Sequence, residues 1–435
     1  MESFLTKKSI LFIALTFVIT SCGGGGGGGG SSDAAGVNSS NPPTVSISAN
    51  PEKLYLGFQT NATVSYNYSN SNSCSGSGSL PSSSGGPGSG GGTYSFSAST
   101  AGTFTFTLTC TNSGGSTSAS ATIIVFERYY KQTEVVTNKN WDAEGFATIT
   151  EGMFLGNGFL TNFDYSGTSD YLLTVTAFEP SDTSFELDYS GSTADGNSFD
   201  FSLIFNDWNT SATLLYDPDD SENAAFAFIR ATYADAVVDG FLTLPDYFAT
   251  QGIEYVSSAL VEIFTNPSYY VIPTNVGEFT KSDDVPTTGT SSKRFDTLGY
   301  YYEASVEAGN QFAGYVVADG QGTLDFNFDN NTVSGSLTYD TFVPYSSFKD
   351  GTGTYNLITS IPDQTITLQN GTISDNSFLA EIVINDGETI GAGLIKGHFY
   401  GPNAEEIGVN IILLDNDDNE NDYFIFTAGG IGQTE

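Results

Sequence analysis

The single histidine of the chain, His398, limits the chemistry that this protein can perform. It excludes a metal site built on paired histidines, and a Ser-His-Asp triad would depend on this one residue in a segment with strand character. Carboxylate pairs are frequent among the 50 Asp and Glu residues, so counting alone leaves a glycosidase-type acid and base open. Nothing in the sequence places two of these carboxylates in one cleft. We therefore predict a binding protein rather than an enzyme.

His398 and Tyr400 stand two residues apart, so in a strand their side chains share one face and Phe399 takes the other. Imidazole and phenol groups both serve as axial ligands of haem iron in other proteins. In the alternative interpretation the two rings pack against neighbouring residues or face solvent.

Residues 415–422 offer a run of Asp, Asn and Glu oxygens of the kind that Ca²⁺ prefers. Counted from Asp415, however, Glu420 stands where an EF-hand loop needs glycine, and Phe426 where it needs the closing glutamate. A solvated turn between two strands is the alternative. We expect no resident cofactor, with haem and Ca²⁺ as the two that the residue types leave open.

The N-terminus indicates export. Lys7 and Lys8 precede an apolar run over 10–19 that is too short to span a bilayer, which is typical of a signal peptide over 1–21. The run ends in Ile-Thr-Ser-Cys22, which resembles the bacterial lipobox and implies cleavage before a Cys22 that carries fatty acyl chains such as palmitate. Gly23, in place of Asp, favours the cell outer membrane in that family, and a surface-exposed position is expected there. Ordinary secretion is the alternative.

The formal net charge is −38. The electrostatic field of so negative a chain repels nucleic acid and anionic lipid headgroups, so we exclude nucleic-acid binding. Two interpretations stay open, namely attraction for cationic partners or divalent ions, and a solvated acidic surface that keeps an exported protein soluble.

Once Cys22 is assigned to lipid, Cys74 and Cys110 remain as one pair. In an oxidising compartment their spacing permits a disulfide. No thiol is then left for catalysis.

Short alternating runs of Phe, Tyr, Val, Ile and Leu among Gly, Ser, Thr and Asn predict an all-β chain. Residues 22–42 form a Gly/Ser tether after the lipidated cysteine. Residues 43–126 alternate as two packed sheets require and resemble bacterial immunoglobulin-like domains. The resemblance rests on Tyr66, eight residues before Cys74, and on 109–112 followed by Gly114-Gly115. It implies a spacer whose disulfide joins facing sheets, although Tyr replaces the usual Trp and 75–92 is expected to be a long Gly/Ser loop.

Two β-rich regions follow. Residues 127–290 are irregular, with an Asp-Pro-Asp-Asp turn signal at 217–220 and a stretch over 256–264 that fits a helix or a strand. Residues 291–435 hold about eight regular strands, including a hairpin around Asn330-Asn331, and eight antiparallel strands of this length close naturally into a barrel.

Residues 397–408, Gly-His-Phe-Tyr-Gly-Pro-Asn-Ala-Glu-Glu-Ile-Gly, are similar to the G-x-F-Y-G-P-x-A-x-E-x-G-G signature of the transferrin-binding protein B family, with Val409 in place of the last glycine. The 324–337 hairpin, the 370–378 pair and the 286–290 linker also resemble that family. The resemblance implies a β-rich handle over 127–290 and an eight-stranded barrel over 291–435. We interpret the signature as structural, because Gly397 and Gly401 bracket a strand end that needs close backbone approach or a bend.

The resemblance implies an outer-membrane lipoprotein, held by its lipid, that binds a solute or an iron or haem carrier protein. A TonB-dependent outer-membrane receptor is a possible partner, and the family's ligand-binding residues, which lie on variable tip loops, cannot be assigned in this chain. The alternative is a structural adhesin or glycan-binding surface lipoprotein. Only Trp141 and Trp208 are present as tryptophan platforms for sugar stacking, which favours the first interpretation.

Overall fold

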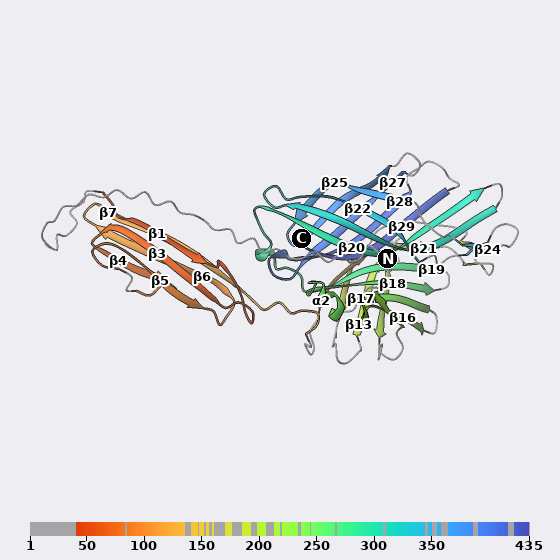
Figure 1. Ribbon diagram of the computed structural model, residues 1–435, viewed down its shortest axis with the longest axis horizontal. Coiled ribbons are helices and arrows are strands. Elements are labelled where there is room, and N and C mark those ends of the chain that lie inside the picture. Colours follow the sequence, from red (N-terminus) through yellow and green to blue (C-terminus); the bar gives the residue numbers. More distant parts are fainter. Residues whose placement is uncertain are drawn as a thin grey trace. The chain divides into compact units, whose positions relative to one another are not determined.

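A computed structural model describes residues 41–82, 85–134, 141–146, 148–151, 154–155, 159–160, 170–175, 185–192, 198–205, 213–217, 220–233, 236–243, 245–265, 268–307, 310–343, 347–349, 355–357, 364–385, 390–415 and 422–434. The fold is all-β, as predicted, and divides into two compact units that meet between Arg128 and Tyr129 (Figure 1). Within the described residues, no helix has the length and apolar character needed to cross a membrane.

The first unit is the two-sheet sandwich that the alternating pattern predicts. One sheet has the order β1 (Thr44–Asn50), β3 (Asn61–Ser71), β5 (Gly88–Ser97). The other has the order β2 (Lys53–Tyr55), β7 (Gly115–Phe126), β6 (Gly102–Asn112), β4 (Ser73–Gly78). Inward-facing residues of both sheets, among them Val64, Phe96, Phe106 and Ile123, form one apolar core.

Cys74 and Cys110 form a disulfide, but the expectation that it joins facing sheets is wrong. The two cysteines are directly opposite each other on neighbouring strands of one sheet, β4 and β6, with their Cα atoms 4.0 Å apart. Because opposed residues of an antiparallel pair project to the same face, their sulfur atoms meet without crossing the core. The disulfide therefore fastens β4, which is an edge strand, to its neighbour.

The Gly/Ser segment 75–92 is strand at both of its ends, so the expected loop is confined to the stretch between Gly78 and Gly88. Its first residues continue β4, and Gly88, Gly90 and Gly92 belong to β5, which pairs with β3. A Cβ atom at Gly90 would lie 2.5 Å from the Tyr68 hydroxyl oxygen, and one at Gly92 would lie 2.7 Å from that of Tyr66. The glycines thus make room for two tyrosine rings, a contact that the composition of the segment alone does not reveal.

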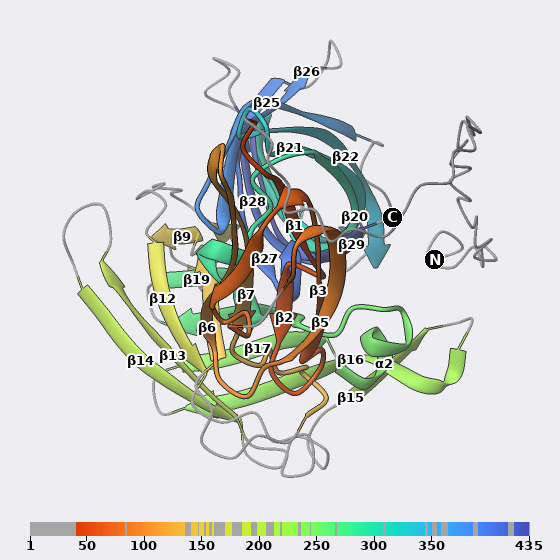
Figure 2. The ribbon, with the colours of Figure 1, turned by 90° about the vertical axis from the view of Figure 1, so that its left-hand side faces the viewer.

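The second unit begins with the region that we call the handle, residues 129–289. Its main sheet has ten strands and runs β14-β13-β12-β8-β19-β18-β17-β16-β15, with β9 paired to β19 off this path. The bounds of these strands are β8 Trp141–Phe146, β9 Thr148–Glu151, β12 Asp170–Val175, β13 Phe185–Ser192, β14 Ser198–Phe205, β15 Thr213–Asp217, β16 Asp220–Tyr233, β17 Ala236–Thr243, β18 Val256–Thr265 and β19 Ser268–Gly277. A short pair, β10 (Phe154–Leu155) and β11 (Phe159–Leu160), stands apart from it. In Figure 2 the sheet, drawn in yellow and green, curves beside the barrel strands in teal and blue.

Two sequence-based expectations can be compared with the structure of the handle, which also contains one helix that was not expected. Asp217 is paired with Asp220 between β15 and β16, as the turn signal predicts. The ambiguous stretch 256–264 is a strand, β18. The one α-helix among the described residues, α2 (Pro245–Thr250), was not expected, because six residues are too few for a helical period to emerge from the sequence.

The remainder of the second unit is a closed antiparallel barrel in the order β20-β21-β22-β25-β26-β27-β28-β29, and β29 pairs with β20 to complete the ring. The strands are β20 Thr290–Glu307, β21 Asn310–Asn327, β22 Thr332–Val343, β25 Gln364–Ser374, β26 Ser377–Asn385, β27 Ile390–Tyr400, β28 Glu406–Asp415 and β29 Asp422–Thr434. A short pair, β23 (Ser347–Lys349) and β24 (Tyr355–Leu357), interrupts the sequence between β22 and β25. The predicted eight-stranded barrel is confirmed, and so is its hairpin, where Asn331 adopts a positive φ of 54° between β21 and β22.

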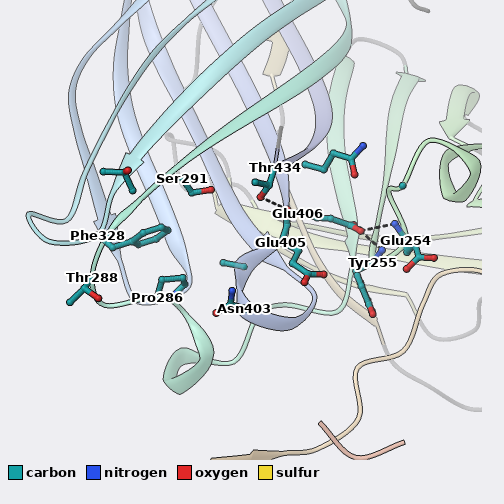
Figure 3. A pocket seen from close by; sticks show the side chains of 15 residues that line it. Glu254, Tyr255, Pro286, Thr288, Ser291, Phe328, Asn403, Glu405, Glu406 and Thr434 are labelled. Atoms are coloured by element: carbon teal, nitrogen blue, oxygen red, sulfur yellow. Dashed lines mark hydrogen bonds between the residues drawn. The ribbon is translucent and has the colours of Figure 1, made fainter. Parts of the chain in front are cut away.

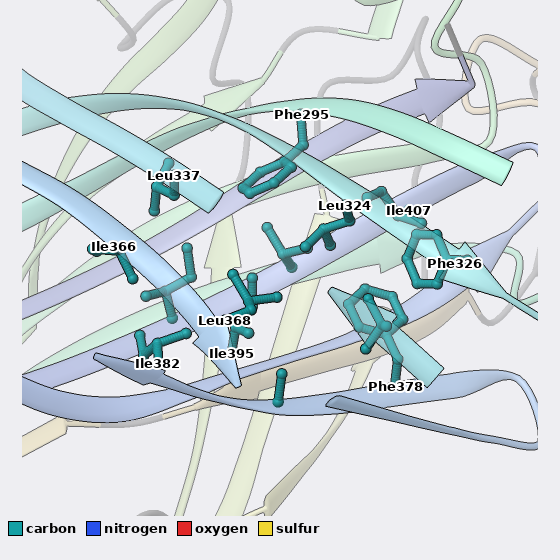
Figure 4. Packing of buried hydrophobic residues seen from close by; sticks show 14 of the residues in the cluster. Phe295, Leu324, Phe326, Leu337, Ile366, Leu368, Phe378, Ile382, Ile395 and Ile407 are labelled. Carbon is teal, nitrogen blue, oxygen red and sulfur yellow. The ribbon is translucent and has the colours of Figure 1, made fainter. Parts of the chain in front are cut away.

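The barrel interior is filled by side chains (Figure 4). Phe326, Phe378 and Phe399 lie in mutual contact, with ring centroids 5.0 to 5.4 Å apart and the rings inclined to one another. Phe295, Leu324, Ile366 and Ile395 extend the core along the barrel axis. The described part of the barrel is therefore a packed core.

Candidate functional site at the handle–barrel junction

The signature residues on strand β27 alternate between the barrel interior and the opposite face of the strand. Phe399 is fully buried inside the barrel, whereas His398 and Tyr400 project from the opposite face, as the strand period predicts. There both rings meet Phe279, which follows the handle strand β19: His398 stacks on it with centroids 4.3 Å apart, and Tyr400 meets it edge-on at 5.1 Å. Tyr400 is fully buried. The structure thus places the pair as packing groups, which is the alternative to haem ligation.

The signature glycines leave room on the barrel for side chains of the handle. Gly401 has a φ of 71°, and a Cβ atom there would lie 2.5 Å from the Tyr255 ring. A Cβ atom at Gly408 would lie 2.7 Å from the Cβ of Asn275 on β19. The expectation of close approach at the end of this strand is confirmed, and the partner is the handle, which the sequence did not show.

Polar side chains cross the same junction. Asn275 donates its amide hydrogens to the carbonyl oxygen of Val409 at 2.9 Å and to Oδ1 of Asn410 at 3.1 Å. The hydroxyl of Thr280 donates to the carbonyl oxygen of Gly401 at 2.8 Å. Asn275 and Thr280 are almost inaccessible to water, so these bonds satisfy the Asn275 amide hydrogens and the Thr280 hydroxyl, which would be costly to bury alone.

Asp284, in the short 3-10 turn η1 (Ser282–Asp284), forms a second polar centre. Its carboxylate accepts hydrogen bonds from the Tyr129 hydroxyl at 3.1 Å and from the backbone N–H of Asn403 at 2.9 Å. Burial, together with the nearby Asp284 carboxylate, raises the pKa of Tyr129 above its ordinary range. The first residue of the second unit is thereby tied to the η2 turn (Pro402–Ala404) of the signature.

Glu406, the glutamate of the signature and the first residue of β28, is 2% exposed. Its Oε1 accepts the backbone N–H of Glu254 at 2.6 Å, and its Oε2 accepts those of Tyr255 and Val256 at 2.8 and 3.1 Å. Burial raises the pKa of Glu406 to about 8, against the opposing effect of these three hydrogen bonds. Sequence reasoning missed this residue as a distinct group, and its place in the signature was the only available signal.

A pocket of about 700 Å³ opens beside Glu406 (Figure 3). It is lined by the residues that join handle and barrel: Gly252, Glu254, Tyr255, Pro286, Thr288, Gly289, Thr290, Ser291, Phe328, Asn403, Ala404, Glu405, Glu406, Gln433 and Thr434. The side chains of Glu254, Glu405 and Glu406 line one wall of it with carboxyl groups, and Glu254 also forms an ion pair with Lys131. Such a wall suits cationic groups or hydrogen-bond donors.

Lys293 lies buried near this wall. Its ammonium group donates to the carbonyl oxygen of Glu405 at 3.0 Å and to the hydroxyl of Thr434 at 2.8 Å. Burial lowers the pKa of Lys293 to about 8, although the neighbouring Glu405 and Glu406 oppose the shift. Among the described residues, no group of three His, Cys, Asp or Glu side chains is arranged to hold a metal ion.

Two sequence-predicted sites fall outside the described residues. Cys22, the predicted lipidation site, precedes residue 41, and most of the 415–422 run proposed for Ca²⁺ lies between β28 and β29, over 416–421. Both stay predictions. Cys74 and Cys110 belong to the first unit and take no part in the junction.

Comparison with protein families matches residues 285–429 to the C-lobe and N-lobe β-barrels of Tf-binding protein B. No curated protein matches the chain.

Several solved structures are similar in outline. The haemoglobin receptor HpuA from Kingella denitrificans has 12% identity and a TM-score of 0.31, over 70% of this chain and 89% of that one. The isotype 1 transferrin binding protein B from serogroup B Neisseria meningitidis has 14% identity and a TM-score of 0.28, over 86% and 76%. A Trp-176-Ala mutant of transferrin binding protein B from Haemophilus parasuis Hp5 has 12% identity and a TM-score of 0.31, over 78% and 84%. The family match and the closed ring of eight strands together show that residues 285–429 form a β-barrel of the transferrin-binding protein B type.

Proposed function

We propose that this chain is a lipid-anchored surface protein of the outer membrane that binds an iron or haem carrier protein. The observation that carries the proposal is the match of residues 285–429 to the barrels of Tf-binding protein B. The lipobox-like sequence that ends at Cys22 supports the anchor, and the tether after it gives the folded units reach from the membrane.

The structure supports a binding role in a second way. The barrel interior is occupied by Phe326, Phe378, Phe399 and their aliphatic neighbours, so a ligand would meet the outside of the unit rather than enter the barrel. A large, folded partner is the kind of ligand that an outer surface recognises. This favours a carrier protein over a small solute enclosed by the barrel.

The test uses the mature chain from Gly23, without its lipid, in isothermal calorimetry against haemin, haemoglobin and iron-loaded transferrin. We expect saturable binding to one of the two proteins. Because a net charge of −38 attracts basic proteins without specificity, lysozyme serves as the control partner, and each titration is repeated in 0.5 M salt.

The outcomes separate the alternatives. Binding of haemin but of neither protein would show that the ligand is a small solute and not a carrier protein. No binding to any of the three would contradict the iron branch of the proposal, and a specific signal on a glycan array would then favour a glycan-binding surface protein.

The anchor is tested separately. Replacing Cys22 removes the only predicted acyl acceptor, so Cys22→Ser should appear in the soluble fraction of cells, while the parent protein sediments with outer membranes after a high-salt wash. Cys110→Ser, which retains Cys22, is the matched control for loss of a cysteine. Retention of the Cys22→Ser variant in washed membranes would exclude lipid anchoring. A TonB-dependent receptor that co-purifies with the lipidated protein would support the uptake role.

A further inference from the structure

A single carboxylate collects three successive backbone N–H groups from another part of the second unit. Glu406 begins barrel strand β28, and its three donors, Glu254, Tyr255 and Val256, lead into handle strand β18. Successive N–H groups that converge on one acceptor group form a concavity that suits a carboxyl group, and buried N–H groups that lose such a partner are costly.

The surroundings of Glu406 make this contact hard to replace. The side chain is 2% exposed, so a handle that moved away would leave its oxygens without partners in a poorly solvated place. Nearby, there is no space for a side chain at Gly401 beside the Tyr255 ring, so the handle and the barrel are closely packed here. The apolar contacts of Tyr400 and Phe279 lie on the same junction but carry no comparable directionality.

We propose that Glu406 is the anchor residue that fastens the handle to the barrel, so that the two regions open and unfold together as one body. This inference does not depend on the identity of any ligand. It assigns the signature glutamate a positioning role, distinct from the strand-ending role of the signature glycines and proline.

The sequence supplies a probe for the test. Both tryptophans, Trp141 and Trp208, belong to the handle segment, so tryptophan fluorescence during denaturant unfolding reports on the handle alone. Hydrogen exchange of peptides from β26 and β27 reports on the barrel in the same sample. In the mature parent protein the two probes should give coincident transitions.

Glu406→Ala removes all three acceptor bonds, and the handle transition should then precede that of the barrel. At the amide level, exchange of Glu254, Tyr255 and Val256 should accelerate by about tenfold or more, the factor expected when buried hydrogen bonds are lost. The matched control is Glu405→Ala, which alters the adjacent, exposed glutamate and should keep the transitions coincident.

Glu406→Gln is a second test of the role of Glu406, and it replaces the first test if the alanine variant fails to fold. The remaining amide oxygen can accept the N–H groups of Tyr255 and Val256, which share one oxygen of Glu406, while the bond to Glu254 is lost. Exchange should therefore accelerate at Glu254 only. Coincident transitions and unchanged exchange in a folded Glu406→Ala protein would overturn the proposal, as would unchanged exchange at Glu254 in Glu406→Gln.

Discussion

The sandwich and the barrel solve the problem of strand edges in opposite ways. The sandwich leaves edges on both sheets, and two of these edge strands are fastened individually: β4 by the Cys74–Cys110 disulfide, and β5 by tyrosine rings that lie over its glycines. The barrel has no edge, since β29 returns to pair with β20, and its stability rests on ring closure around an aromatic core. The first unit therefore depends on contacts that stabilise its edge strands one at a time, whereas the barrel depends on the packing of its whole core.

The largest expected effect is on the barrel core. Phe399→Ala removes a fully buried ring that contacts Phe326 and Phe378, and it should lower the free energy of unfolding of the barrel by about 3 to 5 kcal/mol. Hydrogen exchange of barrel peptides as a function of denaturant measures this. Peptides of β6 and β7 in the sandwich are the internal control, and their joint destabilisation would contradict the separation of the two units.

Reduction of the disulfide should act on the sandwich. Breaking the Cys74–Cys110 bond frees edge strand β4 and restores the entropy of a 36-residue loop in the unfolded chain, so the sandwich should lose about 2 to 4 kcal/mol. The check is hydrogen exchange of β4 and β6 peptides with and without reductant. A barrel midpoint that shifted to the same extent would show that the disulfide is not a local fastening.

Replacing Gly401 at the junction should destabilise the protein for two reasons, its positive φ and its contact with the Tyr255 ring, and a control variant separates them. Gly401→Ala places a side chain at positive φ and drives it into the Tyr255 ring, with an expected cost of roughly 1 to 3 kcal/mol. Gly289→Ala is the matched control, because Gly289 also has positive φ, at 87°, but has open space around it, so it should cost only about 1 kcal/mol. Thermal unfolding followed by tryptophan fluorescence compares them. Equal losses would mean that the ring contact contributes nothing.

The pH dependence should distinguish the junction from the sandwich. The pKa of Glu406 is raised to about 8 from a value of 4.5 in the unfolded chain, so between these pH values the folded protein holds a proton that the unfolded chain has lost. The free energy of unfolding should therefore fall as pH rises from 5 to 7.5, by at most about 1.4 kcal/mol per pH unit.

The groups around Glu406 define the control for this experiment. Partial burial also raises the pKa of Glu405, which acts in the same direction. The pKa of Lys293 is lowered to about 8, so loss of its proton adds stability only above the chosen pH range. Glu406→Gln should flatten the slope more than Glu405→Gln does. Equal slopes in the parent protein and Glu406→Gln, measured by denaturant midpoints, would show that another group titrates.

Much of the barrel was predictable because its residues alternate with a period of two and its turns carry their own signals. The Asn330-Asn331 hairpin and the two faces of 398–400 follow from local rules. Pairing between distant strands does not follow from such rules. The placement of Cys74 and Cys110 on one sheet depends on which strands become neighbours, and the resemblance to immunoglobulin-like domains predicted the right cysteine pair but placed it on facing sheets.

The sequence by itself determined the all-β class, the eight strands of the barrel and the exclusion of a metal site built on paired histidines, because alternation, turn residues and composition are local properties of the chain. Only the tertiary structure decided the role of Glu406. A glutamate at the start of a strand carries no sign of burial, and its three donors lie about 150 residues earlier in the chain. Burial and hydrogen-bond partners are properties of the surroundings, and those surroundings exist only when the handle and the barrel are folded together.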